Sequence, residues 1–160
     1  MNTIEIRRAN INDMAAVLNL ILELARFEES ESSVVMTTEK LQLDGFKEHP
    51  DFICWVAEYN GTIAGMAFVY QRYSTWVGPA LHLEDLIITK SMRGKGIGGR
   101  LLDEVVKYGS SQGVRRISWE VLDWNEPAIK FYEERGARIM RDWHVVQLDE
   151  VGIKNYLDRI

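Results

Sequence analysis

The sequence predicts a mixed α/β fold, in which a central sheet that is antiparallel first and parallel later is flanked by helices. Two β-rich runs meet at Asn60-Gly61, a dipeptide that strongly favours a tight hairpin between antiparallel strands. A strand, a glycine-rich turn and an amphipathic helix follow one another over residues 82–112, and a further strand is expected at 115–121. A strand, helix and strand in this order form a right-handed parallel crossover. We therefore expect a layered α/β domain, with helices on the faces of the sheet.

The composition favours one domain, spanning residues 1–160. A chain of 160 residues with 46% hydrophobic content is long enough for one well-formed core and short for two. The net charge of -5 argues against a nucleic-acid-binding protein, because such a protein needs a basic face. An acidic protein is better suited to a cationic partner.

Several absences narrow the class of protein further. Cys54 is the one cysteine of the sequence, and its place in an apolar run predicts a core position and no disulfide. Residues 1–10 lack the apolar centre of a signal peptide, and no run approaches the roughly 20 apolar residues that span a membrane. We expect a soluble, cytoplasmic protein without membrane association. His49, His82 and His144 share no metal-ligand spacing, which predicts no metal site.

The first elements follow from periodicity and capping. Residues 4–7 alternate apolar and charged side chains, which predicts a short first strand. Asn10, with Asp13 three residues later, is expected to cap a helix with one buried face that ends near Phe27. An acidic, serine-rich connector follows, and a second short helix with a threonine cap is expected to end at Phe46.

The middle of the chain is rich in strand signals. Residues 52–59 and 63–70 are the two expected hairpin strands. Asn60-Gly61-Thr62 also fits a glycosylation acceptor, but the turn is the stronger interpretation in a chain without a secretory signal. A loop over residues 71–79 is then expected to lead into a strand at 82–89.

The C-terminal part is expected to contain two helices and two short strands. Pro127 at the start and Gly136 at the end delimit a helix, as proline favours helix starts and glycine favours helix ends. A hairpin-like pair is expected around residues 137–140 and 143–148, followed by a short amphipathic helix at 151–160.

The glycine-rich turn before the long amphipathic helix predicts an anion site. The first turn of a helix has N–H groups without an intrahelical partner, and the aligned peptide dipoles add partial positive charge there. Glycines let a phosphate approach these N–H groups closely, and two cationic side chains add full charge. The expected phosphate-binding residues are Arg93, Gly94, Lys95, Gly96, Ile97, Gly98 and Gly99.

Two nucleotide motifs compete for the same turn. Gly94 to Gly99 fits G-x-G-x-x-G, and Glu120 lies about 20 residues beyond it, as in dinucleotide-binding folds. However, that motif opens the first half of such a fold, and here only 61 residues follow it. A P-loop is excluded because no Gly-Lys-Ser/Thr closes the glycine run.

The turn over residues 93–98, written R-x-x-G-x-G, resembles the pyrophosphate-binding motif of the GNAT superfamily of acyl-CoA-dependent N-acyltransferases. WNEPAIKFYEERGA at 124–137 resembles the second signature of this family. ELARFEE at 23–29, DGFKEHP at 44–50 and LHLEDLII at 81–88 resemble the diamine (spermidine/spermine) N-acetyltransferase branch. The resemblance implies a GNAT fold, acetyl-CoA as donor with CoA as product, an amine substrate and a homodimer.

Amide formation requires that an ammonium first loses its proton, because a free alkylamine titrates near about 10.4. Glu84, on the strand before the turn, is the expected base, directly or through a water, and the resemblance implies the same role. Asp85 is the expected substrate contact. Strict alternation would point these two carboxylates to opposite faces of the strand, unless a bulge intervenes. The structural alternative is a salt-bridge patch formed by both.

The remaining catalytic and cofactor roles come from the second motif and the strand. Tyr132 is the expected acid, because a phenol can protonate the departing thiolate, and a buried core tyrosine is the alternative. Asn125 is expected to hydrogen-bond the cofactor, to cap the following helix, or both. The resemblance implies that backbone groups of Leu86, Ile87 and Ile88 pair with the pantetheine arm like an added strand.

The substrate contacts are carried over from the diamine branch. Phe27 and Glu28 fall where that branch has an aromatic-acidic pair, and Trp76 precedes the expected catalytic strand. Carboxylates and aromatic faces both hold ammonium groups, whereas helix-end solvation and core packing are the alternatives. Ser74 replaces an acidic residue of the branch, and the acidic loop is shortened to residues 141–143. These departures favour a smaller amine, such as a lysine analogue or short diamine, over a long polyamine.

The predicted function is acetyl-CoA-dependent N-acetylation, by direct transfer, of a primary amine on a small cationic substrate. Three alternatives stay open. They are acetylation of a protein or peptide amine, a non-catalytic CoA-binding sensor module and, more remotely, a nicotinamide-binding protein.

Overall fold

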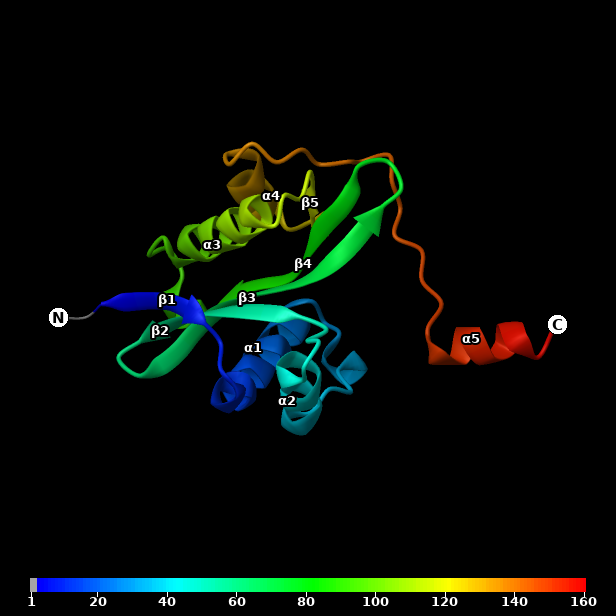
Figure 1. Cartoon of the computed structure of the whole chain (residues 1–160), viewed down its shortest axis with the longest axis horizontal. Helices are drawn as coiled ribbons and strands as arrows, with labels where there is room; N and C mark the ends of the chain where they lie inside the picture. Colours follow the sequence, from blue (N-terminus) through cyan, green and yellow to red (C-terminus); the bar gives the residue numbers. More distant parts are fainter. Residues whose placement is uncertain (1–2) are drawn as a thin grey trace. The chain divides into compact units, whose positions relative to one another are not determined.

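The computed structural model describes residues 3–160. The chain forms two compact units, the first reaching Glu120 and the second running from Val121 to Ile160 (Figure 1). The first contains the sheet and the glycine turn, and the second contains the segment that carries Asn125 and Tyr132. A single domain over the whole chain stays a prediction.

A five-stranded mixed sheet is the framework of the first unit. Neighbouring strands pair antiparallel from β1 to β4, and β4 pairs with β5 in parallel. The expected fold class, a sheet that is antiparallel first and parallel later, is therefore confirmed. The strands lie in the order β1 (Ile4–Arg8), β2 (Ile53–Tyr59), β3 (Thr62–Ser74), β4 (Gly78–Ile88) and β5 (Ile117–Ser118).

Helices cover both faces of this sheet (Figure 1). Side chains of β2 alternate between the two faces. Cys54 and Val56 belong to a core cluster with Met14 and Val17 of the first helix. Trp55, between them, faces the other way, and its ring lies 5.3 Å from that of Tyr108. The helices of this unit are α1 (Met14–Phe27), α2 (Thr38–Phe46) and α3 (Ile97–Ser111), with short 3₁₀ turns at Ile11–Asp13, Glu31–Ser33 and Lys90–Met92.

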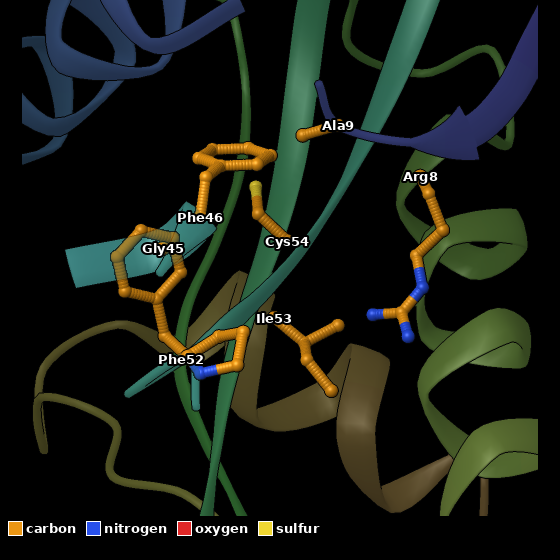
Figure 2. A pocket seen from close by; sticks show the side chains of 8 residues that line it. Arg8, Ala9, Gly45, Phe46, Phe52, Ile53 and Cys54 are labelled. Carbon is orange, nitrogen blue, oxygen red and sulfur yellow. The ribbon is translucent and has the colours of Figure 1, made fainter. Parts of the chain in front are cut away.

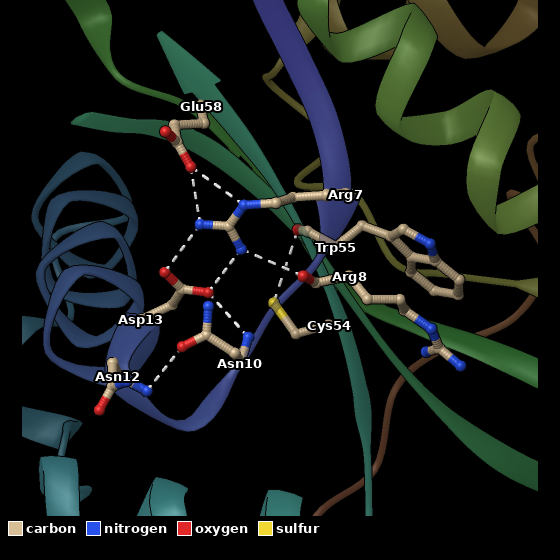
Figure 3. Close-up of polar contacts among 8 residues, drawn as sticks. All are labelled: Arg7, Arg8, Asn10, Asn12, Asp13, Cys54, Trp55 and Glu58. Atoms are coloured by element: carbon tan, nitrogen blue, oxygen red, sulfur yellow. Dashed lines mark hydrogen bonds and ion pairs between the residues drawn. The ribbon is translucent and has the colours of Figure 1, made fainter. Parts of the chain in front are cut away.

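A charged network joins the first strand to the start of α1 (Figure 3). The guanidinium of Arg7 donates to both carboxylate oxygens of Asp13 at 2.7 and 3.0 Å, and to Glu58 on β2 at 2.7 and 3.0 Å. Asn10 and Asp13 form the expected capping box, which closes the 3₁₀ turn leading into the helix. The hydrogen bonds from Arg7 lower the pKa of Asp13, although burial acts in the opposite direction.

The two hairpins of the sheet differ in how well local sequence predicts them. Asn60 and Gly61 have φ of 49° and 76°, the left-handed pair that a two-residue hairpin requires, so the expected turn is confirmed. The expected loop over residues 71–79 is wrong, because β3 continues to Ser74 and β4 already begins at Gly78. Residues 71–73 are exposed and polar or aromatic. They belong to a strand although they lack the apolar alternation from which a strand is predicted.

The second unit contains α4 (Glu126–Glu133) and α5 (Glu150–Leu157). Pro127 lies in the first turn of α4, as expected, and Gly136 follows the helix with φ of 84°. The hairpin expected at 137–148 is wrong, since this segment contains no strand in the structure. A strand needs a neighbour for its backbone groups, and sequence alternation alone does not provide one. None of the helices within residues 3–160 is long and apolar enough to cross a membrane.

Candidate active site

A bulge in β4 decides where the two adjacent carboxylates point. Phe68 of β3 lies opposite Asp85 and the next residue, Val69, lies opposite Leu83, so that Glu84 has no partner on β3. An extra residue of this kind interrupts the alternation and redirects side chains. The Glu84 side chain is accordingly 52% exposed, whereas Asp85 is only partly exposed.

The same strand has an unpaired edge just beyond the bulge. β5 pairs with β4 only at Leu81 and His82, opposite Ile117 and Ser118. Further along, Leu86, Ile87 and Ile88 pair with β3 on one side, and no strand of the described sheet lies on their other side. An edge with unpaired backbone groups is the surface to which an extended ligand adds as a strand. This is the stretch expected to hold the pantetheine arm.

The glycine turn has the backbone geometry of an anion site. Gly94 and Gly96 adopt φ of 77° and 75°, which side-chain-bearing residues rarely adopt. Gly96 is the N-cap of α3 and has no side chain to satisfy the first N–H groups of the helix. A Cβ at either glycine would meet no atom within 4 Å, so the space over the turn is open. An anion could therefore approach these N–H groups directly.

Glu23 of α1, which was not among the expected site residues, hydrogen-bonds the residues that lead into this turn. Glu23 accepts hydrogen bonds from the Thr89 hydroxyl at 2.8 Å and from the Lys90 N–H at 2.9 Å. Arg93 donates from Nε to the carbonyl of Ile88 at 2.9 Å, so its guanidinium is anchored beside the turn. A signal for Glu23 existed, because it is a carboxylate within an otherwise apolar stretch of helix.

The carboxylates of the candidate site influence one another. Burial, followed by the charges of Glu84 and Glu28, raises the pKa of Asp85 to about 7. Burial also raises the pKa of Glu28, which lies at the end of α1. Charges influence one another only at short range in water, so Glu28 and Glu84 both lie near Asp85. The result is an acidic site that suits a cationic ligand.

The two aromatic residues expected to contact substrate lie in different places. Phe27 lies next to the turn, with the Arg93 guanidinium 5.7 Å from the centre of its ring. Trp76 is 81% exposed at the tip of the β3–β4 hairpin. It precedes Glu84 by eight residues, which is roughly 20 Å or more along extended chain. The first unit therefore brings Phe27, but not Trp76, into the candidate site.

His82, one of the three histidines without metal-ligand spacing, lies beside Glu84. Its Nε2 is 3.6 Å from a Glu84 carboxylate oxygen, and its Nδ1 is 3.4 Å from the Ser118 hydroxyl on β5. The residue is buried, and burial lowers the pKa of its imidazole. His82 and Glu84 are two residues apart on β4, a spacing that places their side chains on the same face of a strand.

Asn125 and Tyr132 belong to the second unit. Asn125 is the N-cap of α4, and its side-chain oxygen accepts a hydrogen bond from the Ala128 N–H at 3.3 Å, which confirms the capping interpretation. Tyr132 lies on α4 with its ring 5.2 Å from that of Phe131. Burial raises the pKa of Tyr132 to about 12, so its phenol keeps its proton at neutral pH.

Cys54 lines a small cavity of about 180 Å³ that includes no residue of the glycine turn (Figure 2). Burial raises the pKa of its thiol to about 12, and a protonated thiol is a poor nucleophile. Its expected core position is confirmed. Within residues 3–160 no three potential metal ligands are grouped together. The cavity is lined by Arg8, Ala9, Gly45, Phe46, Pro50, Phe52, Ile53 and Cys54.

Comparison with known proteins places the chain in a family. Residues 15–137 match the model of the acetyltransferase (GNAT) family. The chain is 34% identical over 155 residues to thialysine N-epsilon-acetyltransferase of Sus scrofa, covering 90% of this chain and 91% of that protein. It is 35% identical over 162 residues to the Caenorhabditis elegans enzyme of the same name, covering 99% of both. Identity to the human spermidine/spermine N(1)-acetyltransferase-like protein 1 is 31%, over 93% of this chain and 23% of that protein.

Solved structures agree on the fold. An integron cassette protein from the mobile metagenome of V. cholerae superimposes with a TM-score of 0.78 at 21% identity, covering 96% of this chain and 97% of that one. An aminoglycoside N-acetyltransferase in complex with CoA superimposes with a TM-score of 0.70 at 16% identity, over 94% and 96% of the two chains.

The protein belongs to the GNAT family of acetyltransferases. It is an N-acetyltransferase, as its named relatives are, and enzymes of this family use acetyl-CoA. The resemblance seen in the sequence is thereby confirmed.

Proposed function

We propose that this enzyme transfers the acetyl group of acetyl-CoA to a primary amine of a small cationic substrate. The observation that carries the proposal is the β4 bulge, because it gives one strand an exposed carboxylate at Glu84 and a partly buried one at Asp85 shortly before the glycine turn. The proposed site for acetyl-CoA and the proposed acidic site for the amine are thus next to each other on β4.

The residues of the first unit fit acetyl-CoA. The open left-handed glycines and the uncapped start of α3 suit a pyrophosphate, with Arg93 and Lys95 supplying positive charge. The unpaired edge at Leu86, Ile87 and Ile88 suits the pantetheine arm. The bound donor supplies an activated acetyl thioester.

Glu84 is the proposed base. An alkylammonium with a pKa near about 10.4 must lose a proton before its nitrogen can attack a carbonyl. The Glu84 carboxylate is exposed enough to take that proton directly or through one water. Asp85 and Glu28 hold the positive charge of the substrate, and Phe27 offers an aromatic face to an ammonium.

Tyr132 is the proposed acid. Its phenol keeps its proton at neutral pH because burial raises its pKa to about 12. We propose that this protonated phenol gives its proton to the departing thiolate, and that the proton lost by the new amide nitrogen restores the phenol. Asn125 holds the start of the helix that carries Tyr132.

The proposed substrates are lysine analogues and short diamines. Relatives of the chain are named for thialysine and for spermidine/spermine. Ser74 in place of an acidic residue, together with the shortened segment at residues 141–143, leaves fewer carboxylates for the distant charges of a long polyamine. We therefore expect kcat/KM to be higher for thialysine, lysine and ornithine than for spermine.

The direct test is acetyl-CoA-dependent thiol release with a panel of thialysine, short diamines, polyamines, aminoglycosides and a lysine-containing peptide. Activity should fall at least about a hundredfold in Glu84→Gln and Tyr132→Phe, with acetyl-CoA binding retained, while His49→Gln is the unaffected control. Thiol release with the peptide alone would favour a protein N-acetyltransferase. Acetyl-CoA binding without turnover of any amine would favour a sensor module and contradict the proposal.

We also propose that the enzyme is a homodimer. Apolar side chains near the end of the chain are exposed in the second unit, and contiguous exposed apolar side chains are typical of an interface. Sedimentation should show a dimer, and Trp143→Ser combined with Val146→Ser should shift it toward monomer. A monomer at all concentrations would contradict the proposal. The exposed side chains include Met140, Trp143, Val145, Val146, Leu148, Val151, Tyr156 and Leu157.

A further inference from the structure

We propose that His82 and Glu84 act as one proton-accepting pair, in which Ser118 orients the imidazole. The inference rests on the proposed acetyl transfer and extends it by naming where the substrate proton goes. It assigns His82 a role in the reaction that the sequence did not suggest.

The geometry supports a chain of three polar groups. Nε2 of His82 lies 3.6 Å from Oε2 of Glu84, and Nδ1 lies 3.4 Å from Oγ of Ser118. His82 and Ser118 are directly opposite each other in the parallel pairing of β4 and β5. The bulge turns Glu84 toward solvent at one end of this chain, while His82 is only 6% exposed. Contacts of this length between catalytic groups commonly shorten when substrate binds.

One tautomer suits proton acceptance. When Nδ1 of His82 carries the hydrogen, it donates to the hydroxyl oxygen of Ser118, and the lone pair of Nε2 faces Glu84. A proton that reaches the Glu84 carboxylate then has an acceptor beside it. The opposite tautomer would place an N–H toward Glu84 and would only orient the carboxylate, so the two roles have different consequences for the rate.

Burial keeps His82 neutral before reaction. Burial lowers the pKa of the imidazole, and Arg72 acts in the same direction, whereas Glu84 and Glu120 act against it. The Tyr70 ring packs at 5.0 Å from the imidazole, and burial raises the pKa of its phenol, so that phenol is neutral as well. His82 is therefore uncharged at neutral pH and available as an acceptor.

The proton balance of the reaction requires an exit to water. An ammonium and a thioester give an amide, a free thiol and one proton. The first proton leaves the ammonium nitrogen for Glu84 and then Nε2 of His82, forming an imidazolium beside a carboxylate. It returns through the exposed Glu84 carboxylate to solvent. The amine nitrogen, freed of this proton, forms the C–N bond as the C–S bond breaks.

An imidazole improves the base because its pKa in water lies closer to that of an alkylammonium than the pKa of a carboxylate does. A glutamate carboxylate in water has a pKa near about 4.3, roughly six units below that of an alkylammonium. An imidazole in water titrates near about 6.5. Burial lowers the pKa of His82, and the neighbouring Glu84 carboxylate acts in the opposite direction by favouring the charged form. The pair should therefore capture the proton more often than a carboxylate alone.

The test compares His82→Gln with wild type as the pH rises. At about pH 7, His82→Gln should lower kcat/KM for thialysine roughly tenfold or more, with the Kd of acetyl-CoA unchanged. The wild-type to variant ratio should then fall toward one as the pH approaches the amine pKa near about 10.4, because the free amine needs no acceptor. Since the ratio is taken at each pH, the titration of Asp85 affects both proteins alike. His49→Gln, an exposed histidine, is the matched control and should keep the ratio at one.

The outcomes separate the inference from the proposed function. A rate defect of His82→Gln that is the same at every pH would show that His82 only orients or packs, and would overturn the inference alone. A variant with a lowered Tm and a constant ratio would overturn it in the same way. Ser118→Ala should give a smaller defect with the same pH dependence. If the wild-type protein acetylates no amine, the proposed function fails, and the inference fails with it.

Discussion

The carboxylate of Glu23 on α1 accepts a 2.8 Å hydrogen bond from the hydroxyl of Thr89 at the end of β4. Its other oxygen accepts the N–H of Lys90 at 2.9 Å. The helix that ends in Phe27 and Glu28 is thereby tied to the segment that enters the glycine turn. One side chain thus connects the proposed acceptor side of the site to the proposed donor side.

Removal of this connection should weaken donor binding. We expect Glu23→Ala to raise the KM for acetyl-CoA about tenfold, since two hydrogen bonds to a charged group are lost, each contributing roughly 1 kcal/mol or more. Steady-state kinetics and calorimetric titration with acetyl-CoA measure the effect. Thr89→Val should add little in the Glu23→Ala background if the two residues act through one contact. Glu48→Gln, in an exposed loop, is the control, and additive effects of the two variants would argue against a shared contact.

The left-handed glycines allow a matched comparison. Gly96 at the start of α3 and Gly113 just after its end have φ of 75° and 67°, and a Cβ at either would meet no atom within 4 Å. An alanine should therefore cost each site a similar backbone strain of about 1 kcal/mol. Only Gly96→Ala should also raise the KM for acetyl-CoA, because its methyl group lies where the pyrophosphate is proposed to bind. Equal kinetic effects of the two variants would place the phosphate elsewhere.

Asp85 should make stability depend on pH. Burial raises its pKa in the folded protein to about 7, above the value near 3.9 of an unfolded aspartate. The folded state therefore binds this proton more tightly, and the free energy of unfolding falls as the pH rises from about 4 to about 7. Asp85→Asn should remove this decline and lose activity. The free energy of unfolding of the variant, relative to that of wild type, should therefore rise by up to a few kcal/mol between about pH 4 and about pH 8.

Urea unfolding at a series of pH values measures the effect of Asp85→Asn. Asp103→Asn, an exposed position on α3, is the control and should follow the wild-type curve. A wild-type stability that is constant over this interval would show that Asp85 is not buried as the structure has it.

Asp13 should have the opposite dependence. Arg7 lowers its pKa in the folded protein, so its contribution is fully present above the ordinary aspartate pKa and is lost as the pH falls through the lower folded value. We expect Asp13→Asn to lower the free energy of unfolding by roughly 2 kcal/mol at neutral pH, and by less below about pH 3. Asp51→Asn, in the exposed Lys47–Asp51 pair, should change it by less than about 1 kcal/mol.

Local signals in the sequence were sufficient for many elements. The capping box at Asn10, the hairpin at Asn60-Gly61 and the cap at Asn125 depend on residues within a few positions of one another. The same holds for the glycine turn, whose backbone geometry is dictated by residue types that tolerate a left-handed conformation. Such elements are predictable because the interactions that form them are short in sequence.

Other expectations failed where pairing partners are distant in sequence. Between Gln71 and Leu81, β3 and β4 extend through an exposed stretch because their backbones pair with each other. No apolar pattern in the sequence predicts this pairing. The segment at 137–148 has strand-like alternation yet forms no strand in the structure. In both cases the presence or absence of a neighbouring strand decided the outcome.

By itself the sequence determined the family, the sheet that is antiparallel first and parallel later, and the left-handed glycine turn, and it led to the proposals of a phosphate site and of Glu84 and Tyr132 as base and acid. Only the tertiary structure decided that a bulge exposes Glu84 while Asp85 stays mostly enclosed, that Glu23 hydrogen-bonds the residues entering the turn, and that Ser118 of β5 lies against His82. These facts depend on strand register and on packing between α1 and β4. Register and packing arise from contacts between residues far apart in the chain, which local spacing does not encode.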